Sequence, residues 1–289
     1  MKKKGIESAF HLFFLLCGTV CVAFVLCISV YLIVSGIPAI REIGLWDFLL
    51  GRSWMAQKNE FGALPFLLTS VYGTAGAAAI GVPLGIFTAV YLAKVAPPRV
   101  AEAVHSAVAL LAGIPSVIYG LVGMIVLVPG IQRLFGLSSG ACLLAAIVVL
   151  AIMILPYIIN VSVTALRAVP KEYEEASLAL GATKVETYFK VSLRAARSGV
   201  LTAVMQGVGR AIGEAMAIIM VSGNVPRMPK LLGSVRFLTT AIVSEMSYAS
   251  YGSLQRNALF SVGLVLFLFI MLINALLQWI RRGASECGK

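Results

Sequence analysis

The sequence predicts an all-α, polytopic membrane protein with six transmembrane helices. Hydrophobic residues make up 60% of the 289 residues and charged residues only 12%, whereas an ordinary soluble domain carries about 25% charged residues. Long stretches also lack Asp, Glu, Lys and Arg altogether, and each exceeds the roughly 20 residues that a helix needs to cross the hydrocarbon core. Together these observations exclude a soluble globule, a disordered chain and a nucleic-acid-binding module.

The individual spans follow from the charge-free stretches, taken in order. These stretches cover residues 8–40, 61–93, 103–132, 134–166 and 257–280, and a further apolar stretch covers 198–226. Lipid permits only helices or closed barrels, and a barrel would show shorter, alternating segments. The first stretch follows three lysines, as a signal peptide would, but it is too long and lacks a clear cleavage site. We therefore expect it to be a retained helix.

Positive charge is distributed unevenly between the two sides of the membrane. Lys and Arg gather before the first span, between the second and third spans, in the loop 167–198 and after the last span. The intervening loops are also basic, but they carry fewer such residues. By the positive-inside rule, we expect a multi-pass protein of the cytoplasmic (inner) membrane with both termini in the cytoplasm.

The sequence predicts no metal site, disulfide, cofactor or catalytic residue. The five cysteines show no CxxC or metal-ligand spacing, and the four within spans act as small apolar residues. Residues 283–289 match seven positions of a Walker A loop. A true nucleotide-binding loop follows a strand and opens a helix, whereas this segment follows a membrane helix, so we expect no nucleotide site there.

Proline and glycine within the spans predict interruptions of the helices. Pro115 and Pro156 lie in the third and fourth spans, and each removes a backbone hydrogen bond and clashes with the preceding turn. In the segment Gly113-Ile-Pro-Ser-Val-Ile-Tyr-Gly120, a broken helix would place Ser116 on a transport pathway. Close packing of small residues, which membrane helices use widely, explains the same pattern. The sequence leaves both interpretations open.

Span 198–226 contains two charged residues, Arg210 and Glu214, which are four residues apart and so share a helix face. A lone charge at membrane depth costs roughly 2.5–3.5 kcal/mol on insertion scales, and a pair of opposite charges neutralises itself. The guanidinium is a planar fork of donors suited to an oxyanion. An ion pair that only fixes helix packing is the alternative. Because intramembrane charges usually mark a polar pathway, we favour a role in transport.

The loop 167–198 is the only long stretch of mixed charge, and it predicts two short helices joined by a turn. Pro170 suits a first helical position, and three glutamates in the following turns complement the helix dipole. Gly181 is a plausible stop, and Thr183-Lys-Val-Glu186 reads as a capping box that opens the second helix. Such a hairpin is either an ordinary solvated loop or a docking element for a soluble partner.

This loop carries a resemblance to a known family. Glu175-Ala-Ser-Leu-Ala-Leu-Gly181, followed after nine residues by Val191-Ser-Leu193, resembles the EAA loop of ABC importer permeases. The chain departs from that pattern at the second Ala, at Ile and at Pro, but the spacings hold. The resemblance implies a type I ABC importer permease fold and assigns coupling to an ATPase to Glu175, Ala176, Gly181 and Leu193.

Two further segments are similar to the phosphate importer permeases of that family. These are Gly113–Gly120 and Gly209-Arg-Ala-Ile-Gly-Glu214, and the run through Val221-Ser-Gly-Asn224 resembles the PstC type more than the PstA type, as does Phe61-Gly-Ala-Leu-Pro65. The resemblance implies that Arg210 and Glu214 take part in phosphate passage. It also implies three partners: a PstA-like permease, an ATP-binding cassette ATPase dimer and a periplasmic phosphate-binding protein. ATP hydrolysis then belongs to the ATPase.

The domain organisation follows from these assignments. We expect a first helix and outer loop at 1–60, a core permease domain at 61–282 and a tail at 283–289. Four basic residues of the outer segments could attract phosphate or contact the binding protein, or they could simply be solvated: Arg227, Lys230, Arg236 and Arg256.

Two alternative functions remain open at this point. A permease for another oxyanion, such as sulfate or molybdate, would share the loop and the six spans. An ion-driven secondary transporter would usually show internal repeats and further intramembrane charges, and the sequence shows no clear repeat. An intramembrane hydrolase would need a base, and His11 and His105 lie near the predicted membrane ends.

Overall fold

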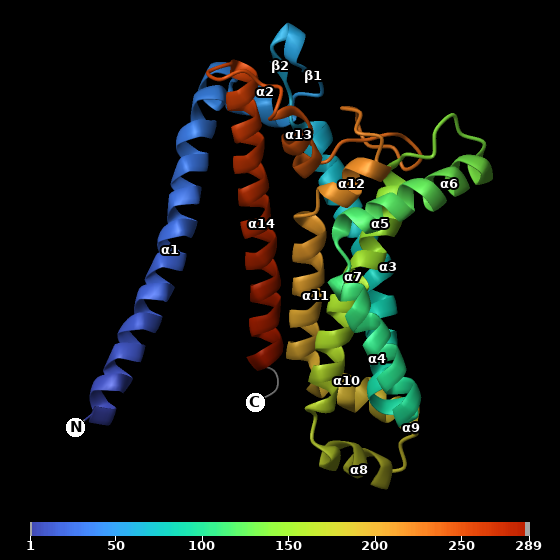
Figure 1. The fold of residues 1–289 in the computed structure, drawn as a ribbon. Coiled ribbons are helices and arrows are strands. Elements are labelled where there is room, and N and C mark those ends of the chain that lie inside the picture. The colour runs from blue at the N-terminus through green and yellow to red at the C-terminus, as the bar shows by residue number, and fades with distance from the viewer. Residues whose placement is uncertain (1, 287–289) are drawn as a thin grey trace.

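The computed structural model describes residues 2–286, with side chains for residues 10–280, and it is a bundle of long helices. The long helices that form its body are α1 (Lys2–Ile43), α3 (Leu64–Val90), α7 (Leu143–Arg167), α11 (Arg197–Ile212) and α14 (Leu254–Glu286). In Figure 1 they run side by side, and the first residues of α1, the end of α14 and the loop between α7 and α11 lie at one end. These are the segments that the charge pattern placed on one side of the membrane. Of the expected tail 283–289, residues 287–289 lie outside the described residues.

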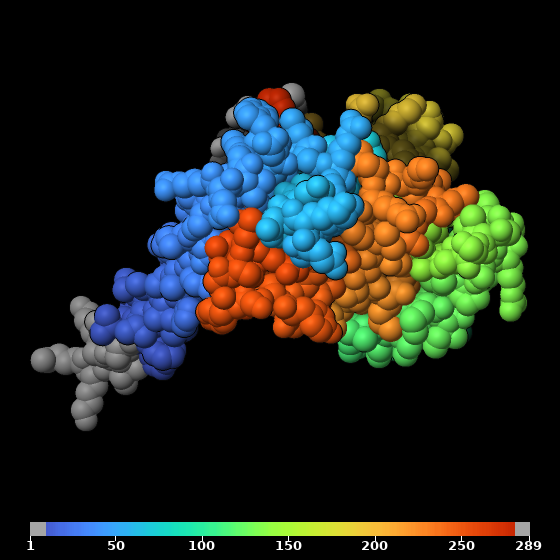
Figure 2. Space-filling model, turned by 90° about the horizontal axis from the view of Figure 1, so that it is seen from above, coloured from blue at the N-terminus to red at the C-terminus, as the bar shows by residue number. Residues whose placement is uncertain are grey.

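The opposite end carries the short elements that connect α1 to α3 and α12 to α14. They are α2 (Leu45–Leu50), β1 (Trp54–Met55), the 3₁₀ turn η1 (Ala56–Lys58), β2 (Glu60–Phe61) and α13 (Leu238–Glu245). The two strands form an antiparallel hairpin with Trp54 opposite Phe61. Its aromatic side chains pack with Phe66 and the buried face of α13. In Figure 2, which looks down on this end, the hairpin and the segment around α13 lie side by side.

The region of the expected third span is divided into several helical segments. After α3 come a π-helical turn η2 (Tyr91–Val95), α4 (Pro98–Gly113), α5 (Ser116–Val122), a π-helical turn η3 (Gly123–Leu127) and α6 (Val128–Phe135). The break falls at Ile114 and Pro115, so the interruption predicted there is confirmed. Beyond it, α5 and α6 turn away from the axis of the bundle (Figure 1).

The interruption predicted at Pro156 is wrong. Helix α7 runs from Leu143 to Arg167 with Pro156 inside it. It is the most buried of the long apolar helices that the structure describes, and it contacts α3, α4 and α11. Packing on several sides holds the helix together although one backbone hydrogen bond is lost, as neighbouring helices commonly allow in membranes.

Five helical segments in the described part of the chain are long and apolar enough to cross a membrane: Phe10–Ile43, Leu64–Val95, Ser116–Phe135, Leu143–Arg167 and Leu254–Ile280. The expected span 198–226 is absent from this set because the structure divides it into α11 and α12 (Met216–Val221). Neither piece alone reaches the length of a membrane-crossing helix. The charged residues of this span lie at the division.

The core of the bundle is the contact between α3 and α7, which depends on small residues. A Cβ atom on Gly81 would lie 2.7 Å from Cδ1 of Ile154, and one on Gly85 would lie 2.6 Å from Cγ2 of Ile158. The four-residue spacing of Gly81 and Gly85 in the second span therefore serves close helix packing and not a break in the helix.

Helix α1 stands apart from this core. It contacts α14 and α2, and Ser261 donates a hydrogen bond to the carbonyl oxygen of Gly36, 2.6 Å away. Its N-terminal half projects from the body of the molecule (Figures 1 and 2), and nearly all large apolar side chains from Phe10 to Val34 are exposed, Leu32 being half-buried. In a bilayer these side chains face lipid or another membrane subunit.

Candidate functional site

The charged residues of the divided span lie where α11 ends and α12 begins. Gly213 closes α11, Ala215 has φ −126° and ψ −47°, and α12 starts at Met216. The four-residue spacing predicted that Glu214 lies on the same continuous helix as Arg210. In the structure Glu214 lies instead in a short non-helical step between the two helices. Its carboxylate oxygen Oε2 is nevertheless 3.6 Å from Nη2 of Arg210, so the predicted ion pair forms.

Glu214 is held in place by three contacts, whereas Arg210 is held by one. Only 4% of the Glu214 side chain is exposed, and its Oε1 accepts a hydrogen bond from the backbone N–H of Ala217 at 3.1 Å. Its backbone carbonyl accepts a hydrogen bond from Oγ1 of Thr239 at 2.7 Å. The Arg210 side chain is 41% exposed, and a guanidinium has five N–H donors. Among the described residues, only Glu214 pairs with Arg210, so most of these donors remain available to another acceptor.

The breaks in the two interrupted helices are brought together. Helix α5, which begins at Ser116 directly after Pro115, packs against α12. A Cβ atom on Gly120 would lie 2.8 Å from Cα of Ala217, so glycine is required for this contact. Ser116 is half-buried. The structure thus places the helix that carries Ser116 against the helix whose first turn is capped by Glu214.

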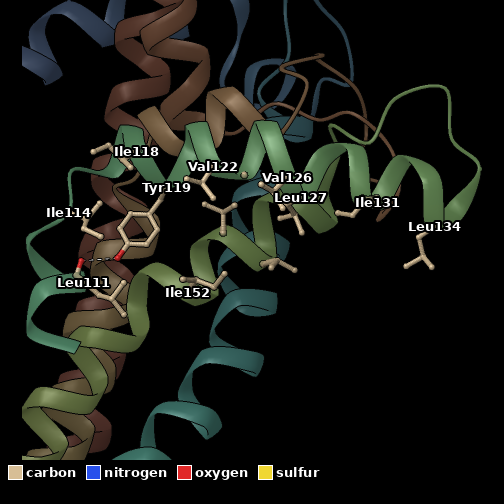
Figure 3. A pocket seen from close by; sticks show the side chains of 14 residues that line it. Leu111, Ile114, Ile118, Tyr119, Val122, Val126, Leu127, Ile131, Leu134 and Ile152 are labelled. Atoms are coloured by element: carbon tan, nitrogen blue, oxygen red, sulfur yellow. Dashed lines mark hydrogen bonds between the residues drawn. The ribbon is translucent and has the colours of Figure 1, made fainter. Parts of the chain in front are cut away.

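A large cavity lies next to this region, but it is not a site for an anion. It has a volume of about 770 Å³ and is lined by apolar side chains of α4, α5, α6 and α7. Figure 3 shows these side chains pointing into it, with the hydroxyl of Tyr119 donating a hydrogen bond to the carbonyl oxygen of Leu111 at 2.8 Å. An unpaired ion is strongly disfavoured in such surroundings, so the candidate anion contacts are those of Arg210.

The loop 167–198 forms the predicted hairpin at the end of the bundle near both ends of the described chain. It comprises α8 (Lys171–Ala179), α9 (Lys184–Glu186), a π-helical turn η4 (Thr187–Ser192) and α10 (Leu193–Ala195). Pro170 precedes α8 as its N-cap, and Gly181 follows its end with φ +86°. That conformation strongly favours glycine, so the predicted stop is confirmed.

The predicted capping box is also present. Oγ1 of Thr183 accepts from the backbone N–H of Glu186, and Oε2 of Glu186 accepts from the backbone N–H of Thr183. The hydrogen bond from Lys190, followed by those from the backbone and hydroxyl of Thr183, lowers the pKa of Glu186 from 4.5 to about 2. Glu186 is therefore ionised, and able to accept these hydrogen bonds, across the physiological pH range.

The structure places the predicted coupling residues on an accessible surface. Glu175, Ala176 and Gly181 are exposed, and Leu193 is half-buried where α10 begins. Tyr173, Leu178 and Leu180 add exposed apolar area to the same loop. Exposed apolar side chains with charged neighbours are typical of a surface that binds another protein.

Several contacts were missed by reasoning from the sequence. Glu174 forms an ion pair with Lys94, a residue 80 positions earlier, and Thr239 binds the backbone of Glu214. Neither contact has a sequence signal, because the partners are distant along the chain and belong to different elements.

The outer basic residues do not form one group. Arg236 pairs with Glu245 and donates to the carbonyl oxygen of Asn224, and its side chain is only 12% exposed. Arg256 lies 4.1 Å from the ring centroid of Tyr251 and donates to a backbone carbonyl. For Arg236, the structure favours none of the roles that the sequence left open, because the carboxylate of Glu245 in α13 already pairs with its guanidinium. Arg227 and Lys230 are exposed.

No group of three or more His, Cys, Asp or Glu side chains in the described part of the chain could hold a metal ion. The structure instead combines a bundle of apolar helices, a broken charged helix within it and an exposed hairpin at one end. These features define a membrane transport subunit. The chain belongs to the family of binding-protein-dependent transport system inner membrane components, whose profile matches residues 81–286.

Relatives of known name agree with this family. The probable ABC transporter permease protein YqgH of Bacillus subtilis is 38% identical over 269 residues, covering 90% of this chain and 87% of that protein. The phosphate transport system permease protein PstC of Xylella fastidiosa is 35% identical, covering 95% and 92%. PstC of Mesorhizobium japonicum is 32% identical, covering 87% and 85%.

A solved structure supports the fold. The MetNI methionine ABC transporter in an inward-facing conformation matches with a TM-score of 0.58 at 22% identity, over 76% of this chain and 94% of that chain. The fold is that of a type I ABC importer permease. As a member of this family, the chain is a permease subunit and not an enzyme, which removes the secondary transporter and the intramembrane hydrolase from the alternatives.

Proposed function

We propose that the chain is the PstC-type permease subunit of an ATP-driven importer of inorganic phosphate. The single observation that carries the substrate assignment is the state of Arg210, whose side chain is 41% exposed beside the buried Glu214 at the break between α11 and α12. The names of the PstC relatives point to the same substrate. Sulfate and molybdate remain the competing oxyanions.

The arrangement suits passage better than tight binding. Arg210 offers charge-assisted hydrogen bonds to an oxyanion, and the carboxylate of Glu214 lies close enough to weaken its hold. Conduction requires that an ion enter easily and also leave easily. Ser116, at the start of the neighbouring α5, is proposed as a further polar contact on the same pathway.

The remaining assignments concern partners and orientation. We propose that the loop 170–194 couples to an ATP-binding cassette ATPase dimer through Glu175, Ala176, Gly181 and Leu193. A PstA-like permease completes the channel, and a periplasmic phosphate-binding protein delivers the substrate at the end that carries the hairpin β1–β2. The protein lies in the cytoplasmic membrane with both termini in the cytoplasm, and residues 61–282 form the core, preceded by the first helix and outer loop at 1–60 and followed by a tail at 283–289.

The test of the substrate is uptake by the reconstituted complex with both permeases, the ATPase and the binding protein. Radiolabelled phosphate should accumulate in an ATP-dependent manner. An excess of sulfate or molybdate of about tenfold over phosphate should leave the rate of phosphate uptake unchanged. Strong competition by sulfate, with sulfate itself transported, would replace phosphate by the other oxyanion.

A further inference from the structure

The side chain of Glu174 faces the membrane helices, in contrast to its neighbour Glu175. Its Oε1 is 2.5 Å from Nζ of Lys94 and accepts a hydrogen bond from Oγ of Ser192 at 2.8 Å. The Lys94 and Glu174 side chains are only 11% and 18% exposed, and Ser192 is fully buried. One carboxylate oxygen on α8 thus contacts two segments that are distant in the sequence.

Both partners of Glu174 lie in π-helical turns that lead directly into membrane helices. Lys94 belongs to η2, which continues α3. Ser192 belongs to η4, which leads through α10 into α11. A π-helical turn is rare and is frequently found at functional sites. Movement of α8 therefore has a direct polar connection to the ends of α3 and α11.

A second contact supports the connection to η4. The hydroxyl groups of Ser177 and Thr187 are 2.9 Å apart, and Thr187 is fully buried. Ser177 stands where the EAA pattern has its second Ala. Helix α8 is thus fastened to η4 at two points, by Glu174 and by Ser177, one helical turn apart.

The far end of this connection is the proposed substrate pathway. Arg210 lies eighteen residues after Ser192, and most of that interval is the helix α11. At 1.5 Å per residue this corresponds to about 27 Å along the axis. Because a packed helix shifts as a unit, displacement of the N-terminal end of α11 is transmitted to the break at its C-terminal end, where Glu214 lies.

We propose that Lys94, Glu174 and Ser192 form a joint that transmits movement of α8 to α3 and α11. This inference rests on the proposed coupling function of the loop. Glu174 is a positioning residue, since its carboxylate binds Lys94 and Ser192 and only 18% of its side chain is exposed. Glu175, one residue later and exposed, has the separate role of contacting the ATPase.

The test separates docking from transmission in the assembled complex. Lys94→Met should leave co-purification of the ATPase and ATP hydrolysis within about twofold of the wild type, while substrate uptake falls about tenfold or more, in the range of typical coupling energies. Glu174→Gln, which keeps an acceptor for Ser192, should show a smaller loss. The exchange Lys94→Glu with Glu174→Lys should recover much of the uptake.

Lys190→Met is the matched control. Lys190 pairs with Glu186 within the same loop, but these side chains are 70% and 46% exposed and both belong to the second half of the hairpin. This variant should transport normally. Normal uptake by Lys94→Met, or loss of uptake in proportion to loss of bound ATPase, would overturn the joint.

A distance measurement tests the proposed joint independently of the proposed substrate. Spin labels can be attached at Glu172 on α8 and at Gln206 on α11, both exposed, in a variant without native cysteines. The distance between the two labels should be the same with and without trapped nucleotide. With Lys94→Met that distance should change or broaden between the two states. If wild-type complex fails to carry phosphate while this distance behaviour holds, the substrate is wrong and the joint stands. Identical distances in both proteins would refute the joint.

Discussion

At the scale of single residues, the membrane break owes its character to the unequal environments of two charges. Glu214 is buried and receives a backbone hydrogen bond at the start of α12, so it acts as a cap as well as a counter-ion. Arg210 pairs with Glu214 alone in the part of the chain that the structure describes, which leaves most of its donors available. We therefore expect Arg210→Gln to lower phosphate uptake by about 10- to 100-fold, which corresponds to one charge-assisted hydrogen bond of about 1.5–3 kcal/mol. The complex should still assemble, as measured by co-purification.

The companion variants distinguish transport from packing. Glu214→Gln keeps an acceptor for the N–H of Ala217, so it should preserve the fold while changing how long phosphate is retained. The exchange Arg210→Glu with Glu214→Arg moves the guanidinium out of its exposed position, so it should stay inactive. Restored transport by the exchange, or full transport by Arg210→Gln, would show that the pair serves packing alone.

A second residue-scale prediction concerns pH and the capping box. The pKa of Glu186 is lowered to about 2, so its ionised form is favoured in the folded loop. Stability from this group is fully present above about pH 4.5, its reference value, and is lost as the pH falls through about 2. Hydrogen exchange of η4, corrected for the intrinsic rate, should therefore accelerate between these values. In Glu186→Gln, whose side chain does not titrate there, the acceleration should be absent.

At the scale of elements, the turn after α8 determines the shape of the hairpin α8–α10, for which coupling is proposed. Gly181 has φ +86°, and its N–H donates to the carbonyl oxygen of Leu178 at 3.0 Å. Gly181→Pro removes this donor and fixes φ near −65°, so ATPase co-purification should be lost while membrane insertion remains. Gly181→Ala should cost about 1–2 kcal/mol of local strain and lower ATPase recovery only partly. Normal ATPase recovery and uptake by the proline variant would remove this turn from the mechanism.

The elements also show what can be predicted from sequence and what cannot. The break at Pro115, the stop at Gly181 and the capping box at Thr183 depend on local chemistry, and each is found in the structure. Pro156 obeys the same local rule but is overruled by packing around α7. The division of span 198–226 was missed because glycines are tolerated in membrane helices, and only the contacts of Glu214 show why the chain leaves the helix there.

At the scale of the whole molecule, apolar runs predicted the chain order of the long helices and five of the six expected spans, because lipid leaves few alternatives. Long-range ion pairs could not be predicted in this way. Lys94 with Glu174 and Arg236 with Glu245 join elements that the sequence separates or leaves in loops. Their partners are determined by the packing of the complete bundle. The first pair lies at the end with the coupling loop and the second at the opposite end (Figure 1).

This separation of the two ends leads to the last prediction, which concerns orientation. The start of α1, the hairpin α8–α10 and the end of α14 lie at one end of the bundle, and the sequence near them is rich in Lys and Arg. The positive-inside rule then places this end in the cytoplasm. Single cysteines at Lys184, in α9, and at Arg227, after α12, would report from opposite sides, since both positions are exposed.

In a background without native cysteines, a membrane-impermeant maleimide should label Arg227→Cys in intact cells. It should label Lys184→Cys only after the cells are broken. Pre-blocking Arg227→Cys with a second impermeant reagent should abolish its signal and serve as the control for accessibility. The reverse labelling pattern would show that the protein has the opposite orientation in the membrane. Labelling of both positions from one side would mean that the divided helix α11–α12 does not cross the membrane, because that helix is the element that separates them.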